Sequence, residues 1–315
     1  MEIMVMEVSS QAIKMNRVAG FSYDYALFTN ISPDHIGPDE HADFEEYLDC
    51  KRKIFQISRV GFVNRDDEHY EEMIKNHTCE LYSYGAGEGA DIHMTDVNYV
   101  MKQGFLGLDF AVTGEKMGKV KVAVNMPGYF NAMNALAAVS VCAHLGATEA
   151  AINEALAEVK VNGRMEIVYT GEDKTVIVDY AHNAVSIESL LKTMRSYNPK
   201  RLVVLFGCGG NRSKDRRYSM GEIAGKMADL TIITADNSRF EKVEDIIEDI
   251  KVGMHKTDGK YIVIPDRVKA IQWAMDVHRP GDVILLAGKG HEDYQIIKGV
   301  KHHFDDHEVI REVMK

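Results

Sequence analysis

The stretch from Thr175 to Gly210, TVIVDYAHNAVSIESLLKTMRSYNPKRLVVLFGCGG, decides the fold of the second half of the chain. It holds two short apolar runs, 175–179 and 202–206, with a helical stretch at 188–197 between them. The same alternation continues towards the C-terminus, with apolar runs at 230–234, 261–264 and 283–286 and helical stretches at 244–253 and 268–277. Short apolar strands separated by helices predict an α/β fold with a parallel, doubly wound sheet.

The first half follows a less regular pattern. An apolar opening at 3–8 and a run at 23–29 predict strands, and strands and turns alternate from 60 to 125. Helices are expected at 11–16, 44–58, 129–145 and 148–159. Asn162 and Gly163 then mark a hinge. We therefore expect two domains, 1–162 and 163–315.

Composition limits the kind of protein. The 315 residues are 45% hydrophobic and 27% charged, and the formal net charge is −11. An acidic chain is a poor partner for nucleic acid or an anionic membrane. No apolar run approaches the roughly 18 residues that a membrane span needs, and the opening residues do not resemble a signal peptide. The four scattered cysteines favour free thiols. We expect a cytoplasmic protein.

Polar and glycine residues gather where the predicted strands of the second half end. Ligands bind doubly wound sheets at the carboxyl ends of their strands. The segments there are Asp179–Asn183, Gly207–Arg212, Asp236–Arg239 and Gly288–Glu292. Each segment alone is ordinary loop chemistry, but four at one sheet edge favour a site. Its glycine amides suit phosphate or carboxylate, Arg217 and Arg239 suit carboxylates, and Glu292 suits an ammonium.

Candidates in the first half are weaker on pattern alone. Glu7 and the pair Asp34–His35 offer oxygen and nitrogen ligands for a divalent metal, although an Asp-His pair is usually a capped turn. Lys51, one helical turn after Tyr47, has the pattern of a surface lysine.

The motifs, taken in order, resemble the Mur ligase family along the whole chain. They are MEVSSQA (6–12), NISPDHIGPDEH (30–41), FEEYLDCKRKIF (44–55), GYFNAMNALAA (128–138), GRMEIV (163–168), VDYAHN (178–183), GCGGNRSKDRR (207–217), DNSR (236–239) and GKGHEDYQII (288–297). The resemblance is to the branch that uses ATP to join a diamino acid to UDP-N-acetylmuramoyl-L-alanyl-D-glutamate. It implies an acyl phosphate, two Mg²⁺ ions and positive side chains around the transferred phosphoryl group.

The resemblance also assigns roles to residues. Glu7 and His35 match Mg²⁺ positions, and Lys51 matches a lysine that is carbamylated. Ser9, Ser10 and Arg17 match contacts to the muramoyl-dipeptide. Nucleotide contacts are matched by Asn131, Asn134, Arg164 and Asp179. The acceptor pocket is matched by Arg217, Asp236, Asn237, Arg239, Gly288 and Glu292.

The identity of the acceptor depends on the DNSR motif. The diaminopimelate type has Pro where Ser238 stands, but it shares Arg239, which pairs with the distal carboxylate. Lysine-adding relatives lack that arginine, whereas the SSQA, NISPDHIGP and DYAHN motifs resemble them. A buried Arg239 beside a lysine methylene chain would leave a charge unpaired, at a considerable free-energy cost. We expect meso-diaminopimelate, with L-lysine as the alternative.

One family feature is missing from these residues. No Gly-Lys-Thr or Gly-Lys-Ser occurs, so there is no phosphate loop of the GxxGKT type. The expectation is thus an incomplete central P-loop-type α/β domain followed by a Rossmann-like C-terminal domain. Such a chain would be inactive alone, and a complementing N-terminal segment or self-association through an open sheet edge would be its partner. The alternatives are a non-catalytic paralogue that binds amino acid or nucleotide, and a ligase similar to folylpolyglutamate synthetase.

Overall fold

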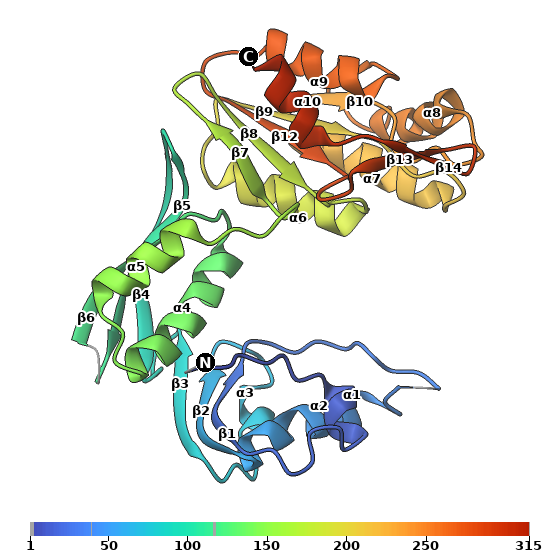
Figure 1. Cartoon of the computed structure of the whole chain (residues 1–315). Coiled ribbons are helices and arrows are strands. Elements are labelled where there is room, and N and C mark those ends of the chain that lie inside the picture. Colours follow the sequence, from blue (N-terminus) through green and yellow to red (C-terminus); the bar gives the residue numbers. More distant parts are fainter. Residues whose placement is uncertain (1–2, 39, 116–117, 315) are drawn as a thin grey trace. The chain divides into compact units, whose positions relative to one another are not determined.

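The computed structural model describes residues 3–38, 40–115 and 118–314. The chain divides into two compact units. The first comprises Met1–Asn98, Asp109–Val124 and Phe130–Ala157, and the second comprises Tyr99–Leu108, Asn125–Tyr129 and Glu158–Lys315. Figure 1 shows both units, coloured along the sequence. Within the described residues, the helices are all too short or too polar to cross a lipid bilayer.

The second unit is built on a six-stranded sheet, which contains the five strands that the sequence predicts and one more. Its strands are β7 (Glu166–Thr170), β8 (Lys174–Asp179), β9 (Arg201–Phe206), β10 (Leu230–Ile233), β11 (Tyr261–Val263) and β12 (Asp282–Ala287). The spatial order is β11-β10-β9-β12-β8-β7. All neighbours are parallel except β7, which runs antiparallel to β8. Each parallel strand therefore sends its carboxyl end to the same edge.

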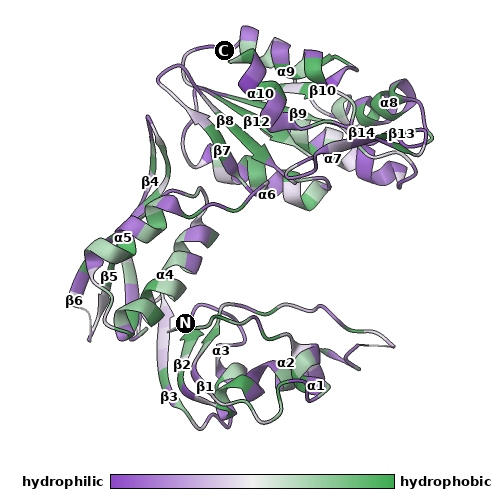
Figure 2. Cartoon of the chain, in the orientation of Figure 1, coloured by the Kyte–Doolittle hydropathy of each residue, from purple (hydrophilic) through white to green (hydrophobic). Residues whose placement is uncertain are grey.

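Helices cover both faces of this sheet because successive side chains of a strand point to opposite faces and both sets are apolar. In β9, Leu202, Val204 and Phe206 enter one apolar cluster, whereas Val203 and Leu205 enter the other. The first cluster is completed by α6 (Ala184–Arg195), α7 (Lys214–Met227) and α8 (Val243–Met254), and the second by α9 (Arg267–Asp276) and α10 (Asp306–Val313). The hydropathy colouring shows the strands as an apolar layer (Figure 2). Strands with two buried faces read as continuous apolar runs.

Several elements of the second unit were not foreseen. They are β7, α7, α10 and the hairpin of β13 (Tyr294–Ile297) and β14 (Val300–His303). Helix α7 carries Gly221, and a Cβ there would lie 2.2 Å from the carbonyl oxygen of Ile250 on α8. Glycine here allows close helix packing. It also interrupts the apolar stripe from which a helix is usually predicted.

The first unit contains a second six-stranded sheet, in the order β1-β2-β3-β4-β5-β6. Its strands are β1 (Tyr23–Phe28), β2 (Ser58–Asn64), β3 (Glu80–Gly85), β4 (Ile92–Lys102), β5 (Phe105–Gly114) and β6 (Gly118–Val124). The helical segments are α1 (Ser10–Lys14), α2 (Phe44–Arg52), η1 (Lys53–Gln56), α3 (Tyr70–Met73), α4 (Tyr129–His144) and α5 (Glu149–Glu158). Strands β1 to β4 are mutually parallel.

The strand expected at 3–8 is wrong. Residues 3–9 belong to no helix or strand, and the side chains of Ile3 and Val5 are 62% and 94% exposed. A run of apolar residues becomes a strand only when its backbone groups find partners in a ladder. No described strand pairs with this segment, so its apolar character alone does not make it a strand.

Candidate functional site

A network of polar side chains lies at the carboxyl ends of β10 and β12. The amide nitrogen of Asn237 donates to Oε2 of Glu292 at 3.0 Å. The ammonium of Lys289 donates to Oδ1 of Asn237 at 3.1 Å and to Oε2 of Glu292 at 3.2 Å. It also lies 3.2 Å from Oδ1 of Asp236. The edge that the sequence predicted as a site thus holds two carboxylates, an amide and one buried cation.

Arg239 stands beside this network with an unpaired side chain. Its backbone has φ 54° and is fixed by the N–H of Arg239, which donates to the carbonyl of Ile296 at 2.9 Å. Its guanidinium, which is half-buried, forms no hydrogen bond or ion pair with the described residues. A planar fork of N–H donors without an internal acceptor is suited to a carboxylate from outside the protein.

Arg217 is in a different situation. Only 1% of its side chain is exposed, and both terminal nitrogens lie 2.8 Å from the carboxylate oxygens of Glu241. Asp249 accepts a further hydrogen bond at 2.9 Å, and the carbonyl of Gly209 accepts one at 3.3 Å. This guanidinium is therefore already matched by two carboxylates. Any ligand carboxylate at Arg217 would have to share it with Glu241 and Asp249.

The glycine loop 207–210 packs directly on the DNSR segment. The N–H of Gly210 donates to the carbonyl of Asn237 at 2.8 Å. A Cβ at Gly210 would lie 1.9 Å from the carbonyl oxygen of Ser238, and one at Gly207 would lie 2.4 Å from that of Thr234. These glycines are required for the close approach of two loops. One of the amides predicted to bind phosphate or carboxylate is thus used inside the protein.

Asp179 connects the segments around the end of β8 through hydrogen bonds. Its two carboxylate oxygens accept the N–H groups of Met165 and Ala181, both at 2.7 Å. Burial raises the pKa of this carboxyl group, although the two amide donors oppose the effect. The backbone carbonyl of Asp179 accepts from Gly288 at 3.0 Å. The nucleotide candidate Asp179 therefore lies next to Gly288, a candidate for the acceptor pocket.

Tyr180 connects the same two groups of candidates. The guanidinium carbon of Arg164 lies 5.2 Å from the centre of the Tyr180 ring. The Tyr180 hydroxyl lies 3.5 Å from Oε1 of Glu292. Close by, Gly163 has φ 67°, and a Cβ there would lie 2.3 Å from the backbone nitrogen of His291. The GRME and GKGH motifs, whose contacting residues Gly163 and His291 are 128 positions apart in the sequence, are thus in contact.

In the first unit, α1 carries the residues predicted to contact the dipeptide. The hydroxyl of Ser9 caps the helix by accepting the N–H of Ala12 at 3.1 Å. Ser10 is buried, and its hydroxyl lies 2.9 Å from Nε2 of His41. Arg17, just after the helix, is exposed and contacts Met15 at 3.2 Å. The three residues lie at both ends of one short helix.

Tyr47 brings Lys51 and His35 to one place. The Lys51 ammonium lies 5.8 Å from the centre of the Tyr47 ring, and the His35 ring lies 5.9 Å from it. His35 has φ 54°, and its Nδ1 is 3.1 Å from Oε1 of Glu40. Glu7 lies in the exposed segment before α1. Lys51 is half-buried and forms no ion pair with the described residues.

The donor set fits a metal only in part. Across 3–38, 40–115 and 118–314, no three His, Cys, Asp or Glu side chains come close enough together to hold an ion. Mg²⁺ in phosphoryl-transfer sites usually takes one or two carboxylates and completes its shell with water and substrate phosphates. Glu7 and His35 therefore belong to no three-donor cluster among the described residues.

The two nucleotide candidates of the first unit lie on α4. Asn131 is buried and Asn134 is exposed, three residues further along the same helix. Residues three apart share one side of a helix. Arg164 and Asp179 belong to the second unit, so the two pairs are positioned by separate scaffolds.

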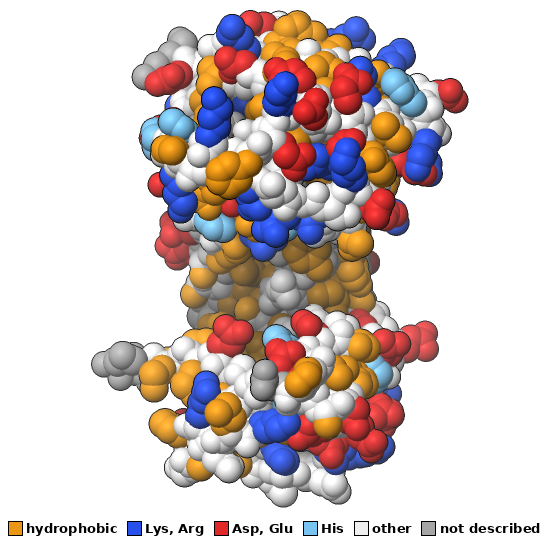
Figure 3. All heavy atoms as spheres, turned by 90° about the vertical axis from the view of Figure 1, so that its right-hand side faces the viewer, with side chains coloured by type: hydrophobic (Ala, Val, Ile, Leu, Met, Phe, Trp, Pro, Cys, Tyr) orange, Lys and Arg blue, Asp and Glu red, His pale blue; other side chains and the backbone are white. Residues whose placement is uncertain are grey.

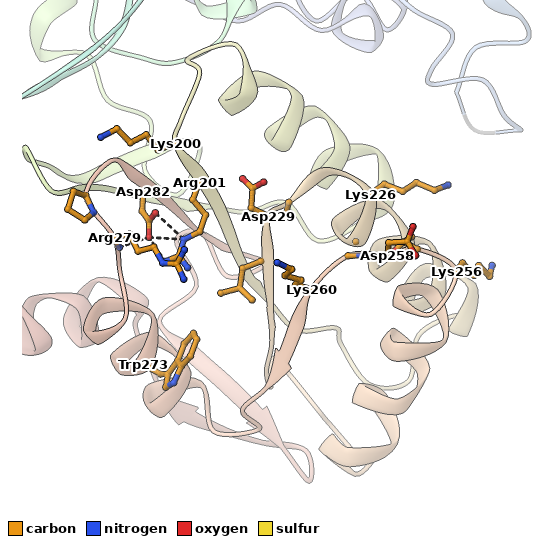
Figure 4. Close-up of a pocket in the computed structure, with 16 residues that line it drawn as sticks. Lys200, Arg201, Lys226, Asp229, Lys256, Asp258, Lys260, Trp273, Arg279 and Asp282 are labelled. Atoms are coloured by element: carbon orange, nitrogen blue, oxygen red, sulfur yellow. Dashed lines mark hydrogen bonds and ion pairs between the residues drawn. The ribbon is translucent and has the colours of Figure 1, made fainter.

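A cleft of about 1050 Å³ lies elsewhere, at the amino ends of β9, β10 and β12 (Figure 4). Arg201, which begins β9, donates to Asp282 at 3.0 Å, and the side chain of Asp282 is 1% exposed. Lys200 and Lys260 also line the cleft, and both are exposed. This end of a parallel sheet carries no strand-end loop of the predicted site, so we do not assign the site to the cleft.

The surface of the second unit is of mixed charge. On the face shown in the upper part of Figure 3, Lys and Arg side chains are interspersed with Asp and Glu. No broad basic area appears on this face, in agreement with the net charge of −11.

Two residues of the site were missed in the sequence. Lys289 and Tyr180 stand inside the GKGHEDYQII and VDYAHN motifs, but the family resemblance assigns a role to neither. The available signal was their position at strand ends, one residue after β8 for Tyr180 and two residues after β12 for Lys289, where ligand-binding loops of such sheets lie. The internal partners of Arg217 could not be foreseen, because Glu241 and Asp249 belong to unremarkable acidic stretches.

Comparison with protein families agrees with this arrangement. Residues 1–142 match the Mur ligase middle domain. Residues 163–290 match the Mur ligase glutamate ligase domain.

Named relatives extend the match to nearly the whole chain. It is 39% identical over 311 residues to the UDP-N-acetylmuramoyl-L-alanyl-D-glutamate–2,6-diaminopimelate ligase of Caldanaerobacter subterraneus subsp. tengcongensis. It is 40% identical over 311 residues to ligase 2 of the same name from Clostridium acetobutylicum. Each alignment covers 98% of this chain and 63% of the relative. The chain thus spans less than two thirds of the length of these relatives.

Solved structures give the same result. The structure of a UDP-N-acetylmuramoyl-L-alanyl-D-glutamate–2,6-diaminopimelate ligase superposes with a TM-score of 0.81 at 31% identity, over 98% of this chain and 63% of that one. The UDP-N-acetylmuramate–alanine ligase of Thermotoga maritima shares the fold, with a TM-score of 0.64 at 19% identity over 93% of this chain and 59% of that one. The α/β architecture, the order of the motifs and both domain matches lead to one conclusion: this chain belongs to the Mur ligase family.

Proposed function

We propose that this chain forms the acceptor-binding part of an ATP-dependent ligase that joins meso-diaminopimelate to UDP-N-acetylmuramoyl-L-alanyl-D-glutamate. The observation that carries the proposal is the unpaired guanidinium of Arg239 beside the Asn237–Glu292 pair. The names of the relatives quoted above support the same acceptor.

The geometry suggests how a diamino acid would be held. Glu292 offers Oε1, which the Tyr180 hydroxyl approaches only to 3.5 Å, to an ammonium group. Arg239 offers its N–H fork to a carboxylate, and Arg217 lies deeper, behind Gly209. Asp236 and Gly288 line the loops between them, since a Cβ at Gly288 would lie 3.3 Å from Oδ2 of Asp236. One ammonium site and one free carboxylate site match an amino acid with a second polar end.

Arg239 is also what separates meso-diaminopimelate from L-lysine in this proposal. The distal end of diaminopimelate carries a carboxylate that would neutralise the guanidinium. Lysine carries only an ammonium there, which would repel it. The alternative acceptor would leave a half-buried charge without a partner.

For the remaining substrates we carry over the family assignments. Asn131, Asn134, Arg164 and Asp179 would contact ATP, and Ser9, Ser10 and Arg17 the muramoyl-dipeptide. Glu7 and His35 would hold Mg²⁺, two ions in the family, which neutralise charge on the transferred phosphoryl group. Lys51, near Tyr47 and without a described carboxylate partner, is available for carbamylation.

We also propose that the boundary between the domains lies at 162/163. A partner for the first unit is part of the same proposal. β1 stands at one end of the first sheet, and no described strand flanks its outer edge. An open edge supports pairing with a complementing segment or a second copy of the chain.

The proposal is tested by calorimetric titration of the 315-residue chain with meso-diaminopimelate and with L-lysine. We expect binding of meso-diaminopimelate and a clear preference over lysine. Arg239→Met should abolish the preference. Arg279→Met, an exposed arginine at the opposite end of the sheet, is the matched control and should keep it. Equal affinity for both amino acids in the unaltered chain would contradict the assignment.

A further inference from the structure

We propose that Lys289 is a positioning residue that fixes the acceptor pocket, by holding Asn237 and Glu292 in the orientation that meets the substrate ammonium. The inference rests on the proposed function and deepens it. It comes from one unusual feature of the second unit, a lysine whose side chain is 0% exposed at the end of a central strand.

The loop between β12 and β13 directs this side chain inwards. Gly288 and Gly290 flank Lys289 with φ 108° and 54°, conformations that glycine adopts at low cost. The Lys289 ammonium then meets the carbonyl of Tyr294 at 2.6 Å, in addition to Asn237, Glu292 and Asp236. A buried ammonium is tolerated only when carboxylates and further acceptors surround it. Here four acceptors face its three protons.

The cluster of Asp236, Glu292 and Lys289 has a net formal charge. Asp236 and Glu292 carry two negative charges and Lys289 one positive charge, so the formal sum is −1. The ammonium of an incoming amino acid brings the sum to zero. Without Lys289 the two carboxylates would face the pocket with a charge of −2, and one of them would gain a proton to relieve the repulsion.

Lys289 also selects the oxygen of Glu292 that is free. Oε2 is occupied by Lys289 and by the amide nitrogen of Asn237 at 3.0 Å. Oε1 is approached by the Tyr180 hydroxyl at the longer distance of 3.5 Å, and the Tyr294 hydroxyl also interacts with the Glu292 carboxylate. The cation therefore turns one oxygen towards the protein and leaves the other for a ligand.

The orientation of the Asn237 amide follows from the same contacts. Its Oδ1 is within 3.1 Å of the Lys289 ammonium and 2.9 Å of the Ile296 N–H. Both neighbours can only donate, so the amide oxygen must face them and the amide nitrogen must face Glu292. Removing the ammonium removes one of the two groups that set this orientation.

The test compares the unaltered chain with Lys289→Met, which keeps the length of the side chain but removes its charge. We expect the dissociation constant for meso-diaminopimelate to rise by about tenfold or more, as loss of a charged hydrogen bond implies. Titrations in phosphate and in Tris buffer measure protons released on binding. The variant should release up to about one proton more than the unaltered chain, because the acceptor ammonium displaces the proton held between Asp236 and Glu292.

Other charged or titratable groups face the cluster, and they stay the same in every variant. Tyr180, Tyr294 and Arg267 all feel the Glu292 carboxylate. His182 and His291 contact the Tyr180 ring, and Arg164 lies over it. Only the difference in proton release between variants is therefore interpreted.

A second variant keeps the test decisive if Lys289→Met does not fold. Lys289→Met combined with Asp236→Asn restores the sum of −1 while Glu292 stays ionised. We expect it to fold, to bind more weakly than the unaltered chain, and to show no extra proton release. A purely structural lysine would lower only the melting temperature.

The outcomes separate the two proposals. If the unaltered chain does not bind meso-diaminopimelate, the proposed function fails. If the unaltered chain binds it and the folded Lys289 variants bind equally well with equal proton release, the proposed function stands and the role of Lys289 is overturned.

Discussion

The guanidinium of Arg164 lies over the ring of Tyr180, with 5.2 Å between the guanidinium carbon and the ring centre. Since the Tyr180 hydroxyl faces Glu292, one aromatic side chain touches a nucleotide candidate and an acceptor candidate. Tyr180 is therefore the described residue through which the two halves of the proposed reaction centre are held at a fixed spacing.

Replacing Tyr180 with Leu should destabilise the second unit by about 1 kcal/mol, because the cation–π contact is lost. The affinity for meso-diaminopimelate should fall several-fold, since Arg164 and Glu292 lose their common neighbour. Tyr180→Phe keeps the ring and should stay within about twofold, because a 3.5 Å contact is a weak hydrogen bond. Urea denaturation and calorimetric titration measure the two effects. Equal behaviour of the two variants would contradict this role of the ring.

The buried ion pair of Arg267 and Asp306 should contribute strongly to the stability of the second unit. Both side chains are 0% exposed, and the guanidinium makes hydrogen bonds of 2.8 and 2.7 Å to the carboxylate. Asp306→Ala leaves a buried charge unpaired and should lower the free energy of unfolding by about 3–5 kcal/mol. The double replacement Arg267→Met with Asp306→Leu should recover most of the loss in urea denaturation. If the double variant were as unstable as the single one, the unpaired charge would not be the cause.

Acid should weaken the second unit through Glu241. Its hydrogen bonds to Arg217 lower the pKa of this carboxyl from 4.5 to about 2. A carboxyl with a depressed pKa in the folded state stabilises fully above its unfolded pKa and loses that effect as the pH falls through the folded value. The stability difference between the unaltered chain and Glu241→Gln should thus be constant above pH 4.5 and shrink towards pH 2. Glu248→Gln, an exposed glutamate on α8, should show no comparable change. Unfolding free energies measured from pH 2 to 7 decide the matter.

Gly163→Ala should disrupt the contact between the GRME and GKGH motifs. A Cβ at Gly163 would lie 2.3 Å from the backbone nitrogen of His291, and φ is 67°. Gly104 is the matched control, since its φ is 74° and nothing lies within 4 Å of its Cβ position. Gly104→Ala should cost about 1 kcal/mol from the backbone conformation alone. Gly163→Ala should cost about 1–3 kcal/mol more, from overpacking. Similar melting temperatures for the two variants would show that the motifs can separate freely.

The 315-residue chain alone should bind the acceptor without turning over ATP. The reason is the missing GxxGKT loop, whose backbone amides and lysine hold the β- and γ-phosphates in phosphate-loop enzymes. The measurement is ADP release in the presence of ATP, Mg²⁺, the UDP-muramoyl-dipeptide and either diamino acid. Steady ADP release that depends on meso-diaminopimelate would mean that other residues grip the phosphates.

The sequence was most informative where burial acts on both sides of a strand. The runs 202–206 and 283–286 became β9 and β12 almost residue for residue, because a doubly covered strand must be apolar throughout. The polar segments after them lie at one edge, as the strand-end rule requires. The run 3–8 is apolar at every position except Glu7 but is not a strand, because strand formation depends on a partner that local sequence does not specify.

The site was less predictable in its charges than in its location. Arg217 and Arg239 have the same side chain and come from recognised motifs, yet one is matched by Glu241 and Asp249 and the other is free. Lys289 has the motif position of a loop residue but is fully buried. Such differences depend on which distant side chains the fold brings near, and periodicity does not report that.

The contact of Gly163 with Gly290 and His291 has a consequence for the order of folding events. Forming it closes a loop of more than a hundred residues by their numbers, and long-range closure is slow because its chain entropy must be spent before the contact stabilises anything. The helices and neighbouring strands can form earlier. Binding of the amino acid during refolding should therefore lag behind the recovery of secondary structure. The time at which acceptor binding returns then reports when the Gly163 contact forms.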